Sequence, residues 1–260
     1  DVGMEYSANP YQGCEHGCIY CYARNSHQYW GYSAGLDFET KIMVKANSVK
    51  LFREFISRKS WTGTPISLSG NTDCYQPLER KFQLTRGILK TASQYGQPVS
   101  IITKNSLILR DADIISELAN RNLCVVYISI NSLTEETRLK LEPRTVTAKQ
   151  RLHVIESLSK LGVPVGIMCA PVIPGLTDHE IPNVLKAAAS AGAKWAAYTT
   201  VRLNGEIGQI FENWLQKAYP DRANKIWHSI QSCHHGKVND SESANRNYTA
   251  LLSWDCNGVI

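Results

Sequence analysis

Short runs of β-branched and other apolar residues alternate with longer amphipathic segments over roughly the first 202 residues of the chain. The apolar runs predict a first strand that ends near residue 9 and further strands at 66–69, 99–103, 125–130, 165–172 and 195–202. Apolar positions spaced three and four residues apart predict helices at 48–59, 85–95, 112–121, 147–161 and 179–191. This alternation is typical of repeated βα units around a parallel sheet.

Local signals mark the ends of three of these helices. Asp111 and Asp178 precede helical stretches, and we expect them to serve as N-caps because a short acidic side chain can accept hydrogen bonds from the first backbone amides of a helix. Gly162 follows the stretch 147–161 and is expected to end it, because glycine readily adopts the left-handed conformation that closes many helices.

Beyond residue 203 the alternation stops. Two helices are expected at 207–217 and 221–232, and the segment from Gly236 is polar and then aromatic, without a clear period. Six βα units are fewer than the eight of a closed TIM barrel. We therefore expect an α/β fold: a partial, laterally open (β/α)6 barrel of TIM type over residues 1–203, with a helical C-terminal extension over 204–260 packed on it.

The composition is that of an ordinary globular protein, with 43% hydrophobic and 20% charged residues among 260. The net charge of +5 mildly favours an anionic partner such as nucleic acid, although the excess is spread along the chain. No apolar run approaches the roughly 20 residues of a membrane span, and we find no signal peptide. We expect a cytoplasmic protein with no membrane partner.

Three of the eight cysteines lie within eight positions, at Cys14, Cys18 and Cys21. A chain of this length and core content does not need a disulfide framework. Close cysteine spacing instead indicates metal ligation. The other five cysteines are scattered: Cys74, Cys124, Cys169, Cys233 and Cys256.

The spacing favours an iron–sulfur cluster over zinc but leaves both open. Three thiolates can bind three irons of a cubane and leave the fourth open to an outside ligand. Gly13 and Gly17 allow the tight turns by which one short loop could wrap a cluster. A structural zinc ion normally takes four ligands. A distant cysteine or histidine could supply the fourth one.

The loop N-P-Y-Q-G-C-E-H-G-C-I-Y-C-Y-A-R, residues 9–24, carries a more specific likeness. Its C-x3-C-x2-C spacing, with Tyr20 directly before the third cysteine, resembles the signature of radical S-adenosylmethionine (SAM) enzymes. The whole loop is similar to that of the spore photoproduct lyase-like branch, often labelled "DNA repair photolyases". The resemblance continues through G-N-T-D (70–73), Y-Q-P-x-E-R (75–80), T-K (103–104), S-I-N (129–131), L-E-P-R (141–144) and P-V-I-P-G-L-T-D (171–178).

This resemblance implies two cofactors, a [4Fe–4S] cluster on Cys14, Cys18 and Cys21 and a SAM molecule that chelates the open iron. It also implies an external one-electron reductant of the flavodoxin or ferredoxin type. In such enzymes the reduced cluster passes an electron to the sulfonium of SAM, and the S–C5′ bond breaks. The resulting 5′-deoxyadenosyl radical abstracts hydrogen from the substrate, while the protein orients the reactants and excludes water.

The resemblance also assigns side chains to SAM. It places Thr72 and Asp73 at the ammonium group, Lys104 at the carboxylate, and Ser129 and Asn131 at the ribose hydroxyls. Each of these residues has a structural alternative, such as a turn cap for the aspartate or solvent contact for the lysine.

Two further residues are matched to SAM in the same way. Tyr20 would lie near the adenine. Arg144 would contact SAM or orient a neighbouring carboxylate, and a salt bridge within its loop explains it equally well.

One part of the repair mechanism is missing. Spore photoproduct lyase returns hydrogen to its substrate from a cysteine, and this chain has Gly70 where that residue would lie. Cys74 could act as a displaced hydrogen donor. The alternative is that Cys74 packs in the core as a small hydrophobic residue.

Three functional classes follow from these patterns. The first is radical SAM chemistry on nucleic acid, in photoproduct-type repair or modification, and the second is the same chemistry on a peptide, protein or small metabolite. The third is a non-enzymatic binding module that its metal only staples together. A basic and aromatic C-terminal region could bind nucleic acid or form a packed helical cap: Trp227, His228, His234, His235, Lys237, Arg246 and Tyr248.

Overall fold

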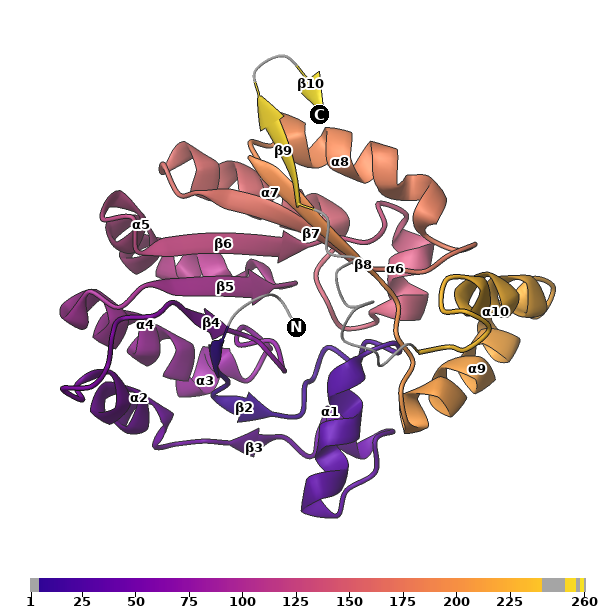
Figure 1. Ribbon diagram of the computed structural model, residues 1–260, viewed down its shortest axis with the longest axis horizontal. Coiled ribbons are helices and arrows are strands. Elements are labelled where there is room, and N and C mark those ends of the chain that lie inside the picture. The colour runs from indigo at the N-terminus through magenta and orange to yellow at the C-terminus, as the bar shows by residue number, and fades with distance from the viewer. Residues whose placement is uncertain (1–4, 240–250, 256–257, 260) are drawn as a thin grey trace.

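The centre of the molecule is a sheet of six parallel strands that follow one another in chain order (Figure 1). The computed structural model describes residues 5–239, 251–255 and 258–259. The strands are β1 (Tyr6–Ala8), β4 (Ile66–Leu68), β5 (Val99–Thr103), β6 (Cys124–Ser129), β7 (Val165–Val172) and β8 (Trp195–Thr200). Within these residues β1 and β8 do not pair, so the barrel is open on one side, as predicted.

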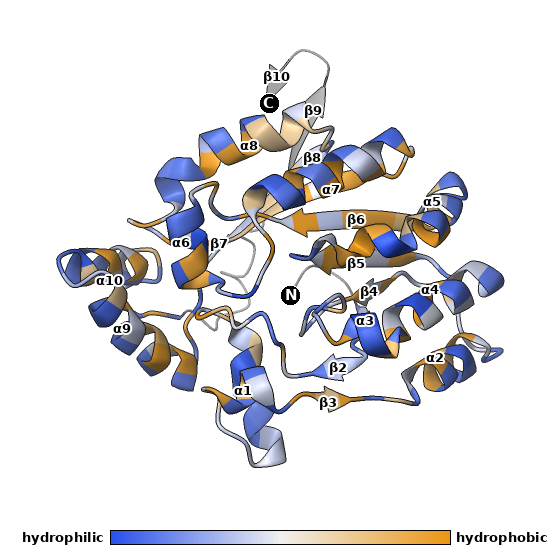
Figure 2. Ribbon diagram, turned by 180° about the vertical axis from the view of Figure 1, so that it is seen from behind, coloured by the Kyte–Doolittle hydropathy of each residue, from blue (hydrophilic) through white to orange (hydrophobic). Residues whose placement is uncertain are grey.

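Amphipathic helices cover the outer face of this sheet. They are α2 (Ser48–Ile56), α4 (Leu84–Tyr95), α5 (Ala112–Asn120), α7 (Ala148–Lys160) and α8 (Ile181–Ser190). In α4, for example, Ile88, Leu89 and Ala92 are buried at helical spacing and join the strand residues in one apolar core. Figure 2 shows the same division, with β6 largely hydrophobic and the helices carrying hydrophilic residues on part of their surface. All five helices were predicted to within a few residues.

Local capping differs from the prediction at two places. Asp111 precedes α5 but makes no capping hydrogen bond, because its carboxylate is used by Arg86 and Arg110. Asp178 lies inside a short 3₁₀ helix, η3 (Asp178–Glu180), and also makes no cap. Gly162 has a φ of +77° just after α7, as expected of a residue that ends a helix.

Several further elements were not predicted individually from the sequence pattern. They are β2 (Tyr11–Gln12), η1 (Tyr22–Trp30), α1 (Asp37–Thr40), β3 (Met43–Val44), α3 (Glu79–Phe82), η2 (Ser106–Asp111) and α6 (Glu135–Leu141). The strands β2 and β3 pair antiparallel beside the main sheet. Of these elements, η1 contributes Tyr22 to the cavity described below.

The C-terminal part begins as two helices, α9 (Glu206–Ala218) and α10 (Ala223–Ser232). They pack in a second apolar cluster with residues beyond the ends of β7 and β8, including Ile173 and Leu203. In Figure 1 they lie on the side toward which the strand arrows point. The chain then adds two strands that the sequence pattern did not predict, β9 (Leu251–Asp255) antiparallel to β8, and β10 (Gly258–Val259) antiparallel to β9. No helix among the described residues is long and apolar enough to cross a bilayer.

Candidate active site

A cavity of about 430 Å³ lies at the carboxyl ends of the parallel strands. Its wall is formed by the segment after β4, residues of β5, β6, β7 and β8, and the loop that carries the three cysteines. All three predicted cluster ligands line it: Cys14, Cys18 and Cys21. Five predicted SAM contacts line it as well: Tyr20, Thr72, Asp73, Lys104 and Ser129. The fold therefore gathers residues that are up to 115 positions apart, from Cys14 to Ser129.

The cysteine loop, residues 13–21, turns through two glycines with positive φ, +83° at Gly13 and +68° at Gly17. Other residues rarely adopt such angles. At Gly17 the space is restricted too, because a Cβ there would lie 2.2 Å from Arg144 Nη2. The backbone angle therefore favours glycine at this position, and a larger residue would also displace the guanidinium of Arg144.

A buried arginine holds this loop in place. Arg24 donates from Nε to the carbonyl oxygen of Cys18 at 2.9 Å and from Nη2 to that of Gly17 at 3.1 Å. Its charge is balanced by Glu39. Arg24 belongs to the motif recognised in the sequence, but its partner Glu39 follows in a segment with no motif of its own. The bonds fix the backbone directly around the second cysteine.

Burial raises the pKa of all three thiols. For Cys14 the pKa rises to about 12, with burial as the main cause and the negative charge of Asp73 as the next. Burial is also the main cause for Cys18 and Cys21. A metal ligand must be a thiolate, so loading this loop with metal releases protons.

The donor set of the cysteine loop fits an iron–sulfur group. Thiolates are the ligands such clusters take, and here three of them face one cavity. Within the described parts of the chain, no three Cys, His, Asp or Glu side chains converge closely enough to hold a single metal ion. Cluster ligation needs no such convergence, because each thiolate binds a different iron.

Asp73 is fixed by the neighbouring strand. Its carboxylate accepts hydrogen bonds from Thr103 Oγ1 at 2.8 Å and from the backbone nitrogen of Lys104 at 2.8 Å. The backbone nitrogen of Tyr75 also donates to it, at 2.8 Å. Because β4 lies beside β5, a carboxylate that follows β4 meets donors at the end of β5.

Buried His16 orients the same carboxylate, a role that sequence reasoning missed. The backbone nitrogen of Leu107 donates to Asn105 Oδ1, which turns Asn105 Nδ2 toward His16 Nε2 at 3.2 Å. His16 Nε2 is then the acceptor, and Nδ1 carries its proton toward Asp73 Oδ2 at 3.4 Å. Burial lowers the pKa of His16 despite the attraction of Asp73, so the imidazole is neutral.

Thr72 and Lys104 differ in whether their polar side-chain atoms already have partners within the described protein. Thr72 Oγ1 donates to the carbonyl oxygen of Tyr11 at 2.7 Å, so its oxygen can only accept from a bound ammonium. The ammonium of Lys104 has no hydrogen bond or ion pair with any residue that the structure describes. It can therefore pair with an anion bound in the cavity.

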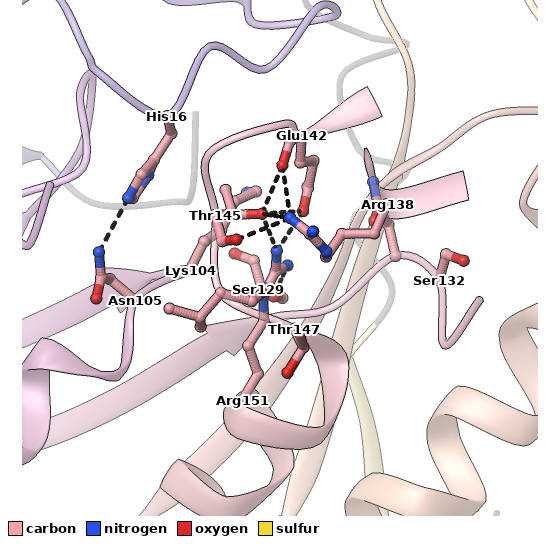
Figure 3. A network of polar contacts seen from close by, with 12 residues as sticks. His16, Lys104, Asn105, Ser129, Ser132, Arg138, Glu142, Thr145, Thr147 and Arg151 are labelled. Atoms are coloured by element: carbon pink, nitrogen blue, oxygen red, sulfur yellow. Dashed lines mark hydrogen bonds and ion pairs between the residues drawn. The ribbon is translucent and has the colours of Figure 1, made fainter. Parts of the chain in front are cut away.

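A buried ion pair lies behind the cavity wall (Figure 3). Glu142 is fully buried, accepts a hydrogen bond from the hydroxyl of Tyr20, and pairs with Arg151 of α7. Arg151 also donates to the carbonyl oxygen of Ser129 at 2.8 Å. Burial raises the pKa of Glu142, but the charges of Arg151 and Lys104 and its hydrogen bonds outweigh burial and bring the pKa to about 2. The charged pair thus joins the cysteine loop to the end of β6.

Sequence reasoning did not find this pair. Glu142 belongs to the L-E-P-R stretch, yet Arg144 drew attention there, and Arg151 sits within an amphipathic helix whose inner face was expected to be apolar. Asn131, predicted at the ribose, instead donates to Tyr20 at 3.3 Å and does not line the cavity. In this structure Asn131 is part of the support for Tyr20.

Arg144 lies outside the cavity lining. Its guanidinium pairs with Glu39 and donates to the carbonyl oxygen of Glu15, and its side chain is 47% exposed. Of the interpretations open for Arg144, this geometry fits a salt bridge, made to Glu39 of α1 and not within the loop of Arg144 itself. Together with Arg24, it makes Glu39 a shared anchor of the cysteine loop.

Two positions decide whether a thiol could return hydrogen to a substrate in the cavity. Cys74 is completely buried in the main apolar core and does not line the cavity, as expected for a small hydrophobic residue. Gly70 does line it, but a Cβ there would lie 2.7 Å from Ser7 Cβ. Within this packing, neither position offers a thiol to the cavity.

The basic and aromatic C-terminal residues serve different purposes. His234 is buried and bonds the carbonyl oxygen of Val201 at 2.7 Å, and Trp227 packs against the second apolar cluster. His228, His235 and Lys237 are exposed. Arg246 and Tyr248 lie outside the described residues.

Residues 8–188 match the family description "Radical SAM superfamily". The chain belongs to this superfamily. Membership implies that it is an enzyme that uses SAM and an iron–sulfur cluster. The match runs from the end of β1 through β7 to α8 and includes the three cysteines and the five predicted SAM contacts that line the cavity, whereas β8 lies beyond it.

Several relatives and solved structures are similar to this chain. Uncharacterized proteins of Mycobacterium bovis and Mycobacterium tuberculosis are 34% identical over 220 residues, which is 84% of this chain and 65% of theirs. The chain thus spans less than two thirds of these relatives. A Pseudomonas phage M6 protein named "Radical SAM Nalpha-GlyT isomerase" is 25% identical, over 76% of this chain and 42% of its own.

Among solved structures, spore photoproduct lyase complexed with dinucleoside spore photoproduct matches with a TM-score of 0.62 at 15% identity. The match covers 98% of this chain and 67% of that one. The likeness confirms the partial TIM-type fold predicted from the sequence.

Proposed function

We propose that this protein holds a [4Fe–4S] cluster on Cys14, Cys18 and Cys21 and cleaves SAM reductively to abstract hydrogen from a nucleic-acid substrate, in repair or modification. The observation that carries the proposal is the shared cavity: three thiols of one loop face it together with Asp73 and Lys104. When bound, the cluster and SAM supply an electron and a 5′-deoxyadenosyl radical. An external flavodoxin- or ferredoxin-type protein would be the source of that electron.

The residues around the cavity have distinct tasks in this proposal. Asp73, held by Thr103 and oriented by His16, accepts hydrogen bonds from the ammonium of SAM. Lys104 pairs with the carboxylate of SAM. Tyr20 and Ser129, braced from behind by the Glu142–Arg151 pair, bound the space for the adenosyl group. This preorganisation keeps the reacting bond in one orientation and limits the entry of water.

A nucleic-acid substrate is supported by the dinucleoside ligand named for a similar solved structure and by the net charge of +5. The lyase reaction in its strict form is not part of the proposal, because neither Gly70 nor Cys74 offers a thiol to the cavity. We propose hydrogen abstraction from the substrate and leave the returning hydrogen unassigned.

Anaerobic reconstitution tests this function directly. The reduced protein should convert SAM to 5′-deoxyadenosine and methionine, and deuterium should move from labelled nucleic acid, including irradiated DNA, into 5′-deoxyadenosine. Deuterium transfer from a peptide or metabolite pool, and not from nucleic acid, would show that the substrate belongs to that other class. Tightly bound zinc with no SAM cleavage would favour a metal-stapled binding module.

A further inference from the structure

Arg202, just after β8, differs from the other arginines that are not fully exposed. The other five each form an ion pair with a carboxylate: Arg24, Arg86, Arg110, Arg138 and Arg151. Arg202 lines the cavity and forms no hydrogen bond or ion pair with any residue in the described parts of the chain. Partial burial of a guanidinium without hydrogen-bond or ion-pair partners costs free energy, and a bound ligand that supplies those partners removes the cost.

Among the lining residues that the structure describes, no carboxylate is left to serve as a counter-ion for this arginine. Among the described lining residues, Lys104 and Arg202 are the permanent cations and Asp73 is the carboxylate. Asp73 is already surrounded by donors from Thr103, Lys104 and Tyr75. SAM carries one carboxylate, which Lys104 can take. Of the two permanent cations on the described lining, Arg202 is the one that neither Asp73 nor the carboxylate of SAM takes.

The position of Arg202 suggests which part of the cavity that molecule would occupy. Asn25 Nδ2 donates to the carbonyl oxygen of Asn204 at 2.7 Å, which ties η1 to the segment after β8. On η1, Tyr22 lines the cavity with a side chain that is 52% exposed, and its hydroxyl is anchored on the carbonyl oxygen of Gly70 at 2.6 Å. A fixed aromatic ring and an unpaired guanidinium thus border the same cavity.

We infer that Arg202 binds a phosphate of a nucleotide-type substrate and that the ring of Tyr22 meets a base of the same substrate. A guanidinium presents a fork of donors that matches phosphate oxygens, and an aromatic ring stacks on any base. The inference rests on the proposed function, because it assumes that a substrate enters beside SAM. It extends that function by assigning the substrate's anionic group to one side chain.

Binding of a fluorescent short oligothymidylate to the reconstituted, SAM-loaded enzyme tests the assignment. Arg202→Gln should weaken binding about tenfold to a hundredfold, as expected for the loss of a charge-assisted hydrogen bond. The slope of log affinity against log salt should fall by about 1. Arg202→Lys should restore part of the affinity, since it keeps the charge but loses the fork. Arg53→Gln, a change on the exposed face of α2, is the matched control and should behave as wild type.

Competitors identify the group that is bound. Unlabelled oligothymidylate should displace the probe best, thymidine 5′-monophosphate less well, and inorganic phosphate only weakly. An acidic peptide that competes better than the oligonucleotide, or no oligonucleotide binding at low salt, would overturn the assignment.

A parallel measurement of SAM affinity separates the two cation roles. Arg202→Gln should weaken oligonucleotide binding much more than SAM binding, and Lys104→Gln should do the reverse. Equal or greater loss of SAM affinity in Arg202→Gln would place Arg202 in the SAM site and refute the inference. A wild-type enzyme that binds oligonucleotide but forms no 5′-deoxyadenosine would contradict the proposed function and not the phosphate site.

Discussion

The two walls of the cavity are built differently. On the wall made by the cysteine loop and the ends of β4 to β6, Asp73 accepts hydrogen bonds from Thr103 and from two backbone amides, and the Glu142–Arg151 pair supports Tyr20 and Ser129 from behind. The ammonium of Lys104 is the exception, because it has no partner among the described residues. On the wall at the end of β8, the side chains of Tyr198, Thr200 and Arg202 make no hydrogen bond to any residue in the part of the chain that the structure describes.

This difference suggests a division of labour. A cofactor that is the same in every turnover benefits from groups held in advance, because preorganisation removes the cost of arranging them. A substrate must enter and leave, so its wall needs groups whose hydrogen-bonding capacity is not already used. We therefore expect substitutions of residues on or behind the first wall to cost stability or activity, and substitutions on the second wall to leave stability nearly unchanged.

The largest effect is expected for Cys18→Ala. It removes one of three cluster ligands, so both iron–sulfur absorbance and 5′-deoxyadenosine formation should fall below detection. Cys233→Ala, an exposed cysteine outside the cavity, should retain both. Normal cluster content in Cys18→Ala would contradict the ligand assignment.

Glu142→Gln should cause the largest loss of stability. The change leaves the buried guanidinium of Arg151 without its counter-ion, and breaking a buried pair in this way typically costs about 3–5 kcal/mol. Thermal unfolding should show a Tm about 10 °C lower. Glu135→Gln, which breaks an ion pair of a half-exposed glutamate with Arg138, should lower stability by about 1 kcal/mol or less.

The same variant predicts a pH dependence. The pKa of Glu142 in the folded protein is about 2, below its ordinary value of 4.5, so its contribution is complete above that ordinary value and is lost as the pH falls toward 2. The Tm difference between wild type and Glu142→Gln, measured on metal-free protein, should be constant above about pH 5 and shrink below it. A difference that grows in acid would show that Glu142 is not held as a carboxylate.

Asp73→Asn should impair SAM use without unfolding the protein. The amide lacks the charge that attracts an ammonium group, and kcat/KM for SAM should fall about tenfold to a hundredfold. Asp178→Asn changes an exposed carboxylate after β7 and should leave kcat/KM unaltered. An unchanged kcat/KM in Asp73→Asn would remove Asp73 from the SAM site.

Gly17→Ala tests the packing of the cysteine loop. The new Cβ meets Arg144 and must also adopt a positive φ, whereas Gly63→Ala has the same backbone problem with open space around it. Gly63→Ala should cost about 1 kcal/mol, and Gly17→Ala should cost more and reduce cluster content. Chemical denaturation and iron analysis of both variants measure the difference.

The smallest effect is expected on the other wall. Thr200→Ala removes a hydroxyl that makes no hydrogen bond to the described residues, so the free energy of unfolding should change by less than about 0.5 kcal/mol. A loss of unfolding free energy comparable to that of Glu142→Gln would contradict the difference between the two walls.

Features that recur or cluster along the sequence could be predicted from it. Periodicity located all six parallel strands and the five helices that cover them, and spacing singled out the three cysteines. The residues that support them were not visible, because Glu39 and Arg151 act through contacts that exist only after folding. Asn131 illustrates the same limit. The sequence placed it after the strand β6, as observed, but its hydrogen bond to Tyr20 exists only after folding.

Mössbauer spectroscopy of the anaerobically reconstituted protein, with and without SAM, tests the central claim most directly. Three cysteine ligands leave one iron of the cluster open, so SAM should change the signal of one iron in four and leave the other three nearly unaltered. A spectrum that does not respond to SAM, or a protein that takes up zinc and no iron, would contradict the account.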